Sequence, residues 1–316
     1  MTEVNPHTKT WITIINPNAG TKKAERDWHN IAQLLRKHEV SFAEVFTLER
    51  GHAMELTREN IKKGYRHFLV VGGDGTMNEV INGIFTQSEI PASEFVVGMI
   101  PVGTGNDWCR SFSIPFSYKK AVKLIKKGNT RIQDVGKISY YNSSTPKSRY
   151  FVNVAGMGYD AVVAAKTNKD KERGRGGPLI YIKNLFTSLI FYKHSSTELH
   201  LDGQSPVRHK TFSLSVGIGK YNGGGMMQLP SAQVDDGKFD VTLIKKLGKF
   251  TVLKEVKNLY DGSFVKHPKV DTYRATEIRI KSSPDISLEA DGESLGHSPF
   301  TFEMIPQALR VIAGSE

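Results

Sequence analysis

The sequence predicts an α/β domain followed by a domain built mainly of β-strands. From Trp11 to about Asp134, short β-rich runs alternate with helical stretches, which is the pattern of βαβ units and a largely parallel sheet. Beyond Asp134, short β-rich runs follow one another between turns rich in Gly, Asp, Asn and Pro, which is typical of a β-sandwich or a barrel-like domain. We therefore expect a Rossmann-like domain over residues 8–134, a sandwich over residues 135–305 and a tail over residues 306–316.

In the first half, each expected strand is followed by a loop and a helix. The strands are Trp11–Ile15, Ser41–Thr47, Phe68–Val71 and Phe95–Ile100, and the helices are Lys23–His38, His52–Lys63, Asn78–Phe85 and Tyr118–Lys127. Loops 16–20, 72–76 and 101–107 leave the ends of three of these strands. Because the carboxyl ends of parallel strands meet at one edge of a sheet, we expect these loops to converge on one ligand site.

The second half is expected to be a series of strands interrupted by helices. The strands are Val135–Tyr141, Tyr150–Ala155, Thr197–Leu201, His209–Ile218, Phe239–Ile244, Ala275–Ile280, Ile286–Ala290 and Phe300–Ile305, and the helices are Ile180–Phe191 and Val252–Tyr260. The charged segment Lys166–Arg175 is expected to be a mobile surface loop, because glycines lie beside it.

Charge and cysteine content limit the partners and the compartment. The formal net charge of +11 favours a polyanion, which can be nucleic acid, an anionic membrane or a phosphate-bearing small molecule. No nucleic-acid recognition motif occurs, so we expect no nucleic-acid partner. The single cysteine, Cys109, excludes an intramolecular disulfide and favours a cytoplasmic protein. The longest apolar-rich stretch, Leu179–Tyr192, is shorter than the ~20 residues of a transmembrane span, so membrane contact is expected to be peripheral.

The loop Gly72–Thr76 is the strongest functional signal. It follows a strand directly and precedes a helix, so its glycines let the backbone approach a polyphosphate while the free amides of the helix start supply donors. The alternative is a plain strand-to-helix turn, since glycine clusters are common there. Neither a Walker A sequence nor a G-x-G-x-x-G fingerprint occurs, which disfavours P-loop NTPases and dinucleotide-dependent dehydrogenases.

Motifs along nearly the whole chain resemble the diacylglycerol kinase catalytic family, which includes soluble bacterial lipid kinases and, more distantly, sphingosine and ceramide kinases. They are Asn16-Pro17 with Gly20, Gly72–Thr76 with Asn78-Glu79, the Pro101–Asp107 loop, Asp134-Val-Gly136, the Asn153–Ala161 segment, Asp235-Asp236-Gly237 and Asp291-Gly292-Glu293. The resemblance implies a fold of the NAD-kinase and lipid-kinase type, with Ala308–Ala313 returning to the first domain as a strand.

The same resemblance implies ATP and Mg²⁺ as cofactors. The nucleotide would be contacted by Asn16, Pro17, Asn18, Ala19, Gly20, Thr47, Gly72, Gly73, Asp74, Gly75, Thr76, Met77, Asn78 and Thr104. Catalytic Mg²⁺ would be organised by Asp74, Asp107 and Asp134, and a structural Mg²⁺ would be held by Asp236 with the backbone carbonyls of Gln233 and Lys238. Lys183 resembles a lysine near the site. Many relatives have a basic residue where this chain has Thr21, which leaves a phosphate role for Lys22 open.

Glu293 resembles the proton acceptor of the family. Phosphoryl transfer to a hydroxyl needs backbone donors, carboxylate-held Mg²⁺ and one base, and these residue types are present. The alternative is that Glu293 is an exposed turn acid, because Asp-Gly is also a strong hairpin signal. The same alternative applies to Asp236.

An apolar helix face beside the basic segment suits docking on an anionic membrane, but it also suits packing in a core. This face consists of Ile180, Leu185, Phe186, Leu189, Ile190 and Phe191.

The sequence thus predicts ATP-dependent phosphorylation of a lipid alcohol, with diacylglycerol as acceptor and phosphatidic acid as product. The expected partner is a lipid presented at a membrane surface, with no nucleic acid, no transmembrane segment and a homodimer as the assembly. The expected location is the cytoplasm, peripheral at the inner membrane surface. One alternative is an NAD kinase, and the other is a non-catalytic module that senses nucleotide or adapts to membranes.

Overall fold

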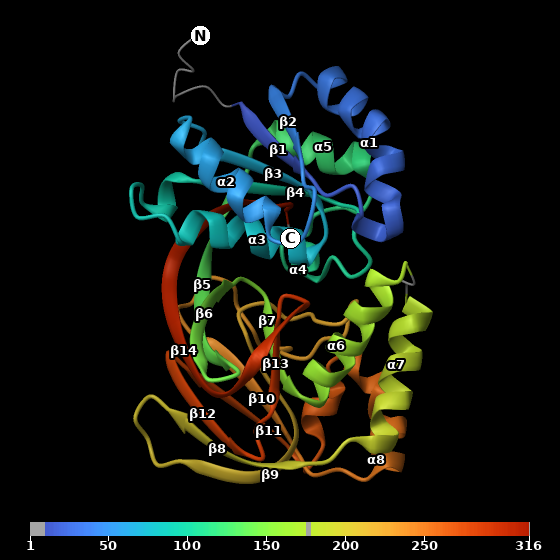
Figure 1. Ribbon diagram of the computed structural model, residues 1–316, viewed down its shortest axis with the longest axis vertical. Coiled ribbons are helices and arrows are strands. Elements are labelled where there is room, and N and C mark those ends of the chain that lie inside the picture. Colours follow the sequence, from blue (N-terminus) through green and yellow to red (C-terminus); the bar gives the residue numbers. More distant parts are fainter. Residues whose placement is uncertain (1–9, 175–177, 316) are drawn as a thin grey trace. The chain divides into compact units, whose positions relative to one another are not determined.

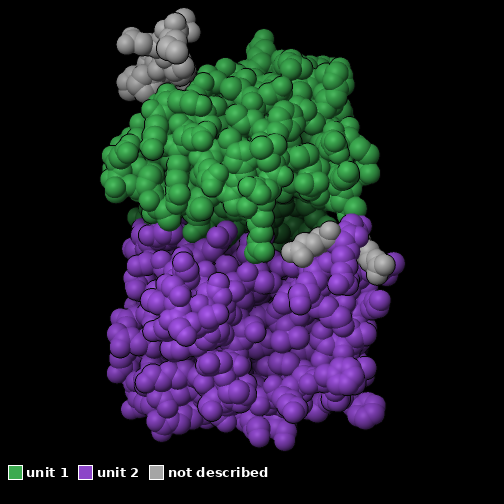
Figure 2. Space-filling view, in the orientation of Figure 1, with its two compact units in different colours: residues 1–133, 307–316 green, residues 134–306 purple. Residues whose placement is uncertain are grey.

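The computed structural model describes residues 10–174 and 178–315. The chain divides into two compact units, Met1–Gln133 with Gln307–Glu316 and Asp134–Pro306 (Figure 2). Unit 1 is an α/β fold and unit 2 is rich in antiparallel strands (Figure 1). The predicted fold class is therefore confirmed.

A parallel sheet forms the centre of unit 1, in the strand order β4-β3-β1-β2. Its strands are β1 (Trp11–Ile15), β2 (Phe42–Phe46), β3 (His67–Gly72) and β4 (Val96–Pro101). Every residue of β1 is buried, as expected for a central strand covered on both faces. Because β1 and β3 are adjacent and parallel, the loops that follow them leave the same edge of the sheet.

Helices cover both faces of this sheet (Figure 1). They are α1 (Ala19–Lys37), α2 (His52–Lys62), α3 (Asp74–Phe85), α4 (Asp107–Ser111) and α5 (Tyr118–Lys127), with a short 3₁₀ turn, η1 (Ala92–Glu94). Ile31 of α1 and Val122 of α5 pack with Val71 in one core. Helices α2 and α3 pack closely at Gly83, where an added Cβ would lie 2.6 Å from Cβ of Thr57. Helix α3 begins at Asp74, four residues earlier than the sequence pattern predicts, so the phosphate-loop residues form its first turn.

Unit 2 is built mainly from antiparallel strands, with β11-β10-β9-β7-β13-β14 as neighbours in that order. They are β5 (Thr130–Asn142), β6 (Thr145–Phe151), β7 (Val154–Gly158), β8 (Ser195–Leu201), β9 (Val207–Gly217), β10 (Phe239–Lys245), β11 (Val270–Ala275), β12 (Glu277–Ser283), β13 (Ser287–Ala290) and β14 (Glu293–Ile312). Phe151, Phe239 and Phe302 pack ring against ring in the interior. The predicted strands Tyr150–Ala155 and Ala275–Ile280 were each wrong in extent, because each spans the end of one strand and the start of the next.

Three α-helices and two 3₁₀ turns lie to one side of these strands among the described residues (Figure 1). They are α6 (Tyr159–Glu172), α7 (Pro178–Phe191), α8 (Lys249–Glu255), η2 (Val256–Leu259) and η3 (Ser263–Lys266). The prediction of a mobile loop at Lys166–Arg175 was wrong for its first part, since α6 continues to Glu172; Arg175 lies outside the described residues. Tyr159 and Val163 of α6 are buried against α7. Because charged residues follow them, the sequence pattern does not indicate that α6 continues as a helix.

Strand β14 continues beyond the predicted Phe300–Ile305. Its last part lies in unit 1, where Arg310 and Val311 pair in parallel with Val96 and Val97 of β4. The segment after Pro306 therefore adds a strand to the sheet that carries the Gly72–Thr76 loop.

Candidate functional site

The three loops that the sequence singles out in unit 1 contact one another. The side-chain amide of Asn16 donates to Oγ1 of Thr76 over 3.0 Å. The backbone amides of Val102 and Gly103 donate to the carbonyl of Gly72 over 2.9 and 3.0 Å. The loops at 16–20, 72–76 and 101–107 therefore converge, as the strand order predicts.

Close backbone approach explains the glycines of these loops. A Cβ on Gly103 would lie 2.6 Å from Cα of Gly73, and a Cβ on Gly73 would lie 3.1 Å from Cα of Gly103. Gly72 faces Thr76, whose Oγ1 would lie 2.8 Å from an added Cβ. Gly20 has a φ of +62° and would meet the carbonyl of Val102 if it carried a side chain. The loops thus present bare backbone, which is what a bound polyphosphate needs.

Two carboxylates lie side by side at this edge. Asp74, the first residue of α3, accepts hydrogen bonds from the amides of Asp107 and Trp108 over 3.1 and 3.0 Å. Oδ2 of Asp74 and Oδ2 of Asp107 both face Gly105, at 3.1 and 3.2 Å from the position of an added Cβ. Burial, reinforced by these two acids, raises the pKa of the Cys109 thiol, so this cysteine is an inert core residue.

The paired acids fit Mg²⁺, which proteins usually hold through one or two carboxylates together with substrate phosphates. Oδ1 of Asn106 is buried beside them, without a hydrogen-bond partner among the described residues. The third predicted acid, Asp134, belongs to unit 2, where its Oδ2 accepts from the amide of Gly237 over 2.7 Å. Within the described ranges, no group of three or more His, Cys, Asp or Glu side chains could hold a metal ion by itself.

The other predicted nucleotide contacts differ in exposure. Thr104 is exposed, whereas Thr47 is buried and its amide donates to the carbonyl of Ile15 over 2.9 Å. Met77 and Asn78 are fully buried in α3, so their side chains face the core. Their predicted contact with a nucleotide would therefore be made by the backbone at the start of the helix.

The turn that carries Glu293 is held from several directions. Asp291 and Gly292 have φ values of +50° and +82° and connect β13 to β14. The Asp291 carboxylate accepts from the amides of Val152 and Asn153, both over 2.9 Å. Asn168 of α6 donates to the carbonyl of Gly292 over 2.9 Å. Glu293 itself is half-buried. This environment differs from that of a free surface hairpin.

Asp236 is paired with an arginine. Its carboxylate accepts from the guanidinium of Arg274 and from the amide of Lys238, the latter over 3.1 Å. Arg274 also lies 3.4 Å from Oδ2 of Asp240. A cation therefore already neutralises the carboxylate that the resemblance assigns to structural Mg²⁺. The metal would have to share this carboxylate with Arg274, so the donor set does not fit Mg²⁺ as it stands.

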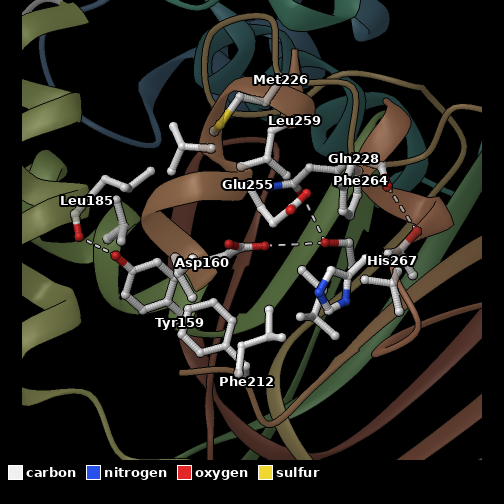
Figure 3. A pocket seen from close by; sticks show the side chains of 18 of the residues that line it. Tyr159, Asp160, Leu185, Phe212, Met226, Gln228, Glu255, Leu259, Phe264 and His267 are labelled. Atoms are coloured by element: carbon white, nitrogen blue, oxygen red, sulfur yellow. Dashed lines mark hydrogen bonds between the residues drawn. The ribbon is translucent and has the colours of Figure 1, made fainter. Parts of the chain in front are cut away.

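A mainly apolar cavity lies within unit 2 (Figure 3). Its empty volume is about 730 Å³, counted out to its open mouth. The apolar lining includes Tyr159 of α6, Leu185 of α7, Phe212 of β9, and Leu259 and Phe264 from the segment after α8. A mainly apolar lining of this kind is typical of sites that bind apolar ligands.

Two acids, Asp160 and Glu255, lie in the wall of this cavity, and Asp160 is the one beside Tyr159 (Figure 3). The hydroxyl of Ser215 lies 3.3 Å from its Oδ2 and 2.9 Å from Oε1 of Gln228. Burial raises the pKa of Asp160 to about 6, although hydrogen bonds from Ser213, Ser215 and Gln228 oppose the shift. Sequence reasoning gave Asp160 no role of its own. Its position two residues after Gly158 in the Asn153–Ala161 motif was the available signal.

Helix α7 has a buried face and an exposed apolar face. Leu185 and Leu189 are 7% and 5% exposed and pack in the core, whereas Phe186, Ile190 and Phe191 are 39%, 57% and 84% exposed. Part of the predicted apolar face therefore packs in the core, and part is exposed and available for docking on a membrane. Lys183 lies on the exposed side.

Within the described residues, no helix combines the length and hydropathy needed to cross a membrane.

Comparison with known proteins gives matches over nearly the whole chain. The diacylglycerol kinase catalytic domain matches residues 10–138, and the YegS C-terminal NAD kinase beta sandwich-like domain matches residues 153–313. The chain is 30% identical to the YtlR protein of Bacillus subtilis (strain 168), over 95% of this chain and 98% of that protein. It is 29% identical to a diacylglycerol kinase of Staphylococcus carnosus (strain TM300), over 94% of this chain and 93% of that protein.

Solved structures share the fold. A diacylglycerol kinase from Bacillus anthracis str. Sterne has a TM-score of 0.72 at 24% identity, covering 97% of both chains. An NAD kinase from Archaeoglobus fulgidus in complex with ATP has a TM-score of 0.51 at 12% identity, covering 96% of this chain and 93% of that chain. At these identities the likeness concerns the fold alone.

Proposed function

Because the chain belongs to the diacylglycerol kinase catalytic domain family and carries a YegS-type C-terminal domain, we propose that it transfers the γ-phosphoryl group of ATP to the hydroxyl of diacylglycerol. The products are phosphatidic acid and ADP. The observation that carries this proposal beyond the family is the apolar cavity of unit 2, which has a carboxylate in its wall. An apolar cavity suits acyl chains, and the carboxylate suits a hydroxyl-bearing headgroup.

The converging loops of unit 1 are proposed to bind the triphosphate. Backbone amides of the Gly72–Thr76 loop and the start of α3 supply donors without side chains, and the helix dipole favours the negative charge. Asp74 and Asp107 are the residues that would hold catalytic Mg²⁺, and Asp134 is proposed to assist them. When bound, the metal neutralises charge on the β- and γ-phosphates.

Glu293 is proposed to accept the proton of the acceptor hydroxyl as the oxygen attacks the γ-phosphorus and the bond to the ADP oxygen breaks. A positioned general base contributes about 10²–10⁴-fold in rate. The turn of Glu293 is held by Asp291 and Asn168, so its carboxylate starts from a fixed backbone.

The acceptor is proposed to enter the cavity with its hydroxyl end toward Asp160. As the lipid binds, ionised Asp160 is proposed to accept the hydrogen bond of its hydroxyl, and the same proton passes to Glu293 only at the transfer step. Tyr159, Leu185 and Phe212 surround the apolar chains. A nicotinamide dinucleotide, the acceptor in the alternative function, is too polar for this lining.

The exposed face of α7 is proposed to dock on an anionic membrane, where the lipid is found. Phe186, Ile190 and Phe191 are exposed there, and the exposed Lys183 supplies positive charge beside them. The location at the inner membrane surface follows from this contact. A homodimer is the proposed assembly, and sedimentation of the purified chain tests it.

A survey of acceptors tests the proposed function. The purified chain is incubated with Mg-ATP and a total lipid extract, and lipids that gain a phosphate are identified by mass spectrometry; NAD serves as a separate acceptor. We expect diacylglycerols to be converted to phosphatidic acids and NAD to stay unchanged. Phosphate gained by another lipid class would overturn the choice of acceptor, and NADP formation would overturn the lipid kinase itself.

A further inference from the structure

A second buried acid, Glu289, lies on β13 next to the turn that carries Glu293. Its side chain is 2% exposed. Oε2 accepts a hydrogen bond from the amide of Gly292 over 3.0 Å, and Oε1 accepts one from the side-chain amide of Asn222 over 2.7 Å. Both carboxyl oxygens are therefore used, and one of them holds the residue directly before Glu293.

A missing side chain makes room for Glu289. A Cβ on Gly156 would lie 2.6 Å from Oε1 of Glu289 and 3.0 Å from Cβ of Asp160. Glu289 therefore lies beside both Gly156 and Asp160, an acid of the cavity wall. Only a residue without a side chain at position 156 allows this approach.

Asn222 connects Glu289 to a loop of the cavity. The backbone amide and carbonyl of Asn222 exchange hydrogen bonds with those of Met226, over 2.9 and 3.1 Å, and Met226 lines the cavity. Oδ1 of Asn222 accepts from the amide of Gly223 over 2.8 Å, which fixes the orientation of its side chain. The Glu289 carboxyl thus joins the Glu293 turn to the loop 222–226.

We propose that Glu289 is a positioning residue for phosphoryl transfer, which holds the Gly292–Glu293 backbone in register with the acceptor cavity through its contacts to Gly292 and Asn222. This inference rests on the proposed function for the reaction that it assists. Glu289 is buried and contacts the backbone of the turn, so it acts through Glu293 without touching the reacting atoms.

The electrostatic environment agrees with this role. Burial raises the pKa of Glu289 to about 8, with smaller contributions from the charges of Asp160 and Asp291, while the bonds from Asn222 and Gly292 lower it. A buried carboxyl group close to other acids destabilises the folded state unless hydrogen bonds compensate for its burial. Those contacts all lead to the turn or to the cavity loop.

Hydrogen exchange of the Gly292 amide tests the contact itself. Glu289→Met keeps the volume but removes both acceptor oxygens, Glu289→Ala removes the side chain, and Glu289→Gln keeps one acceptor. We expect exchange to be about tenfold or more faster in the Met and Ala variants and close to wild type in E289Q. Glu277→Gln, at an exposed glutamate of β12, is the matched control. Unchanged exchange in both E289M and E289A would overturn the proposal.

Steady-state kinetics of the same variants tests the consequence. We expect kcat to fall about tenfold in E289M, with KM for ATP unchanged and most of kcat restored in E289Q, because misplacing a catalytic group lowers kcat. A kcat within about twofold of wild type in E289M, or a loss that E289Q does not restore, would contradict positioning. If the wild type phosphorylates no lipid, the proposed function fails, and the exchange measurement still decides whether Glu289 holds the turn.

Discussion

The functional region of unit 1 is formed mainly by backbone groups, whereas that of unit 2 is formed mainly by side chains. In unit 1, the region around Gly72–Thr76 consists of backbone at the ends of parallel strands, with glycines that allow the loops to touch. In unit 2, the region around Glu293 consists of side chains from distant segments, among them the half-buried Asn168 and Asn222 and the buried Glu289. A site made of backbone depends on a few residues that are adjacent in the sequence. A site made of side chains depends on residues that only the fold brings together. Substitutions in the two regions should therefore affect different quantities: nucleotide affinity in unit 1, and kcat or KM for the lipid in unit 2.

The largest expected effect is that of Glu293→Gln. Removing the proposed base should lower kcat by about 10²-fold or more, since proton acceptance is lost. ATP affinity, measured by titration calorimetry, should stay within about twofold because the base makes no ground-state contact with the nucleotide. Equal losses in ATP binding and in kcat would mean that Glu293 has a structural role.

A smaller but still large effect is expected for Gly103→Ala. Its Cβ would collide with the backbone at Gly73, so the loops must separate. Such overpacking costs about 1–3 kcal/mol, and we expect the affinity for ATP to fall about tenfold or more. Gly248→Ala is the control, because an added Cβ there meets only Oγ1 of Thr251 in α8, at 3.9 Å. Nucleotide titration and thermal melting measure both quantities.

Asp160→Asn should change the use of the lipid and leave the nucleotide unaffected. We expect KM for the lipid to rise about tenfold, because a charged acceptor of a hydroxyl hydrogen bond is lost. In the wild type, KM for the lipid should fall as pH rises through about 6, where Asp160 ionises. Kinetics at fixed lipid mole fraction between acid and neutral pH measure this. A pH dependence that Asp160→Asn retains would assign it to another group.

The smallest expected effect is the contribution of Glu289 to the pH dependence of the free energy of unfolding. Its pKa rises from 4.5 to about 8 on folding, so the folded state binds more protons and the free energy of unfolding falls as pH rises between these values. Glu289→Gln cannot titrate. Its melting temperature relative to wild type should therefore increase with pH, by about 5 °C between pH 5 and pH 9. A constant difference across this range would show that Glu289 does not carry the shifted pKa.

The same contrast explains how much the sequence could predict. The strands and loops of unit 1 were predictable because an apolar run that ends in Gly72-Gly73 is typical of a buried strand followed by a turn. The order of these strands predicted that the loops converge. The second half of helix α6 was mistaken for a loop, because the buried residues Tyr159 and Val163 precede a run of charged residues. The sequence pattern alone could not separate the two faces of α7.

The side chains that support Glu293 could not be found in this way. Glu289 and Asn222 are far apart in the chain, and each is an ordinary polar residue in its own segment. Only the pairing of β13 with β7 brings Glu289 beside Gly156. Likewise, Arg274 meets Asp236 because β11 pairs with β10, and this contact alters the expectation for structural Mg²⁺.

Phosphorylation of a lipid hydroxyl with ATP is the proposed activity of this chain. The most direct measurement supplies radiolabelled γ-phosphate ATP and Mg²⁺ to the purified chain with vesicles that contain diacylglycerol, and follows label in the lipid and aqueous phases. We expect labelled phosphatidic acid in wild type and almost none in Glu293→Gln. Label that appears only as free phosphate or in a water-soluble acceptor, from a folded protein that binds ATP, would contradict the claim.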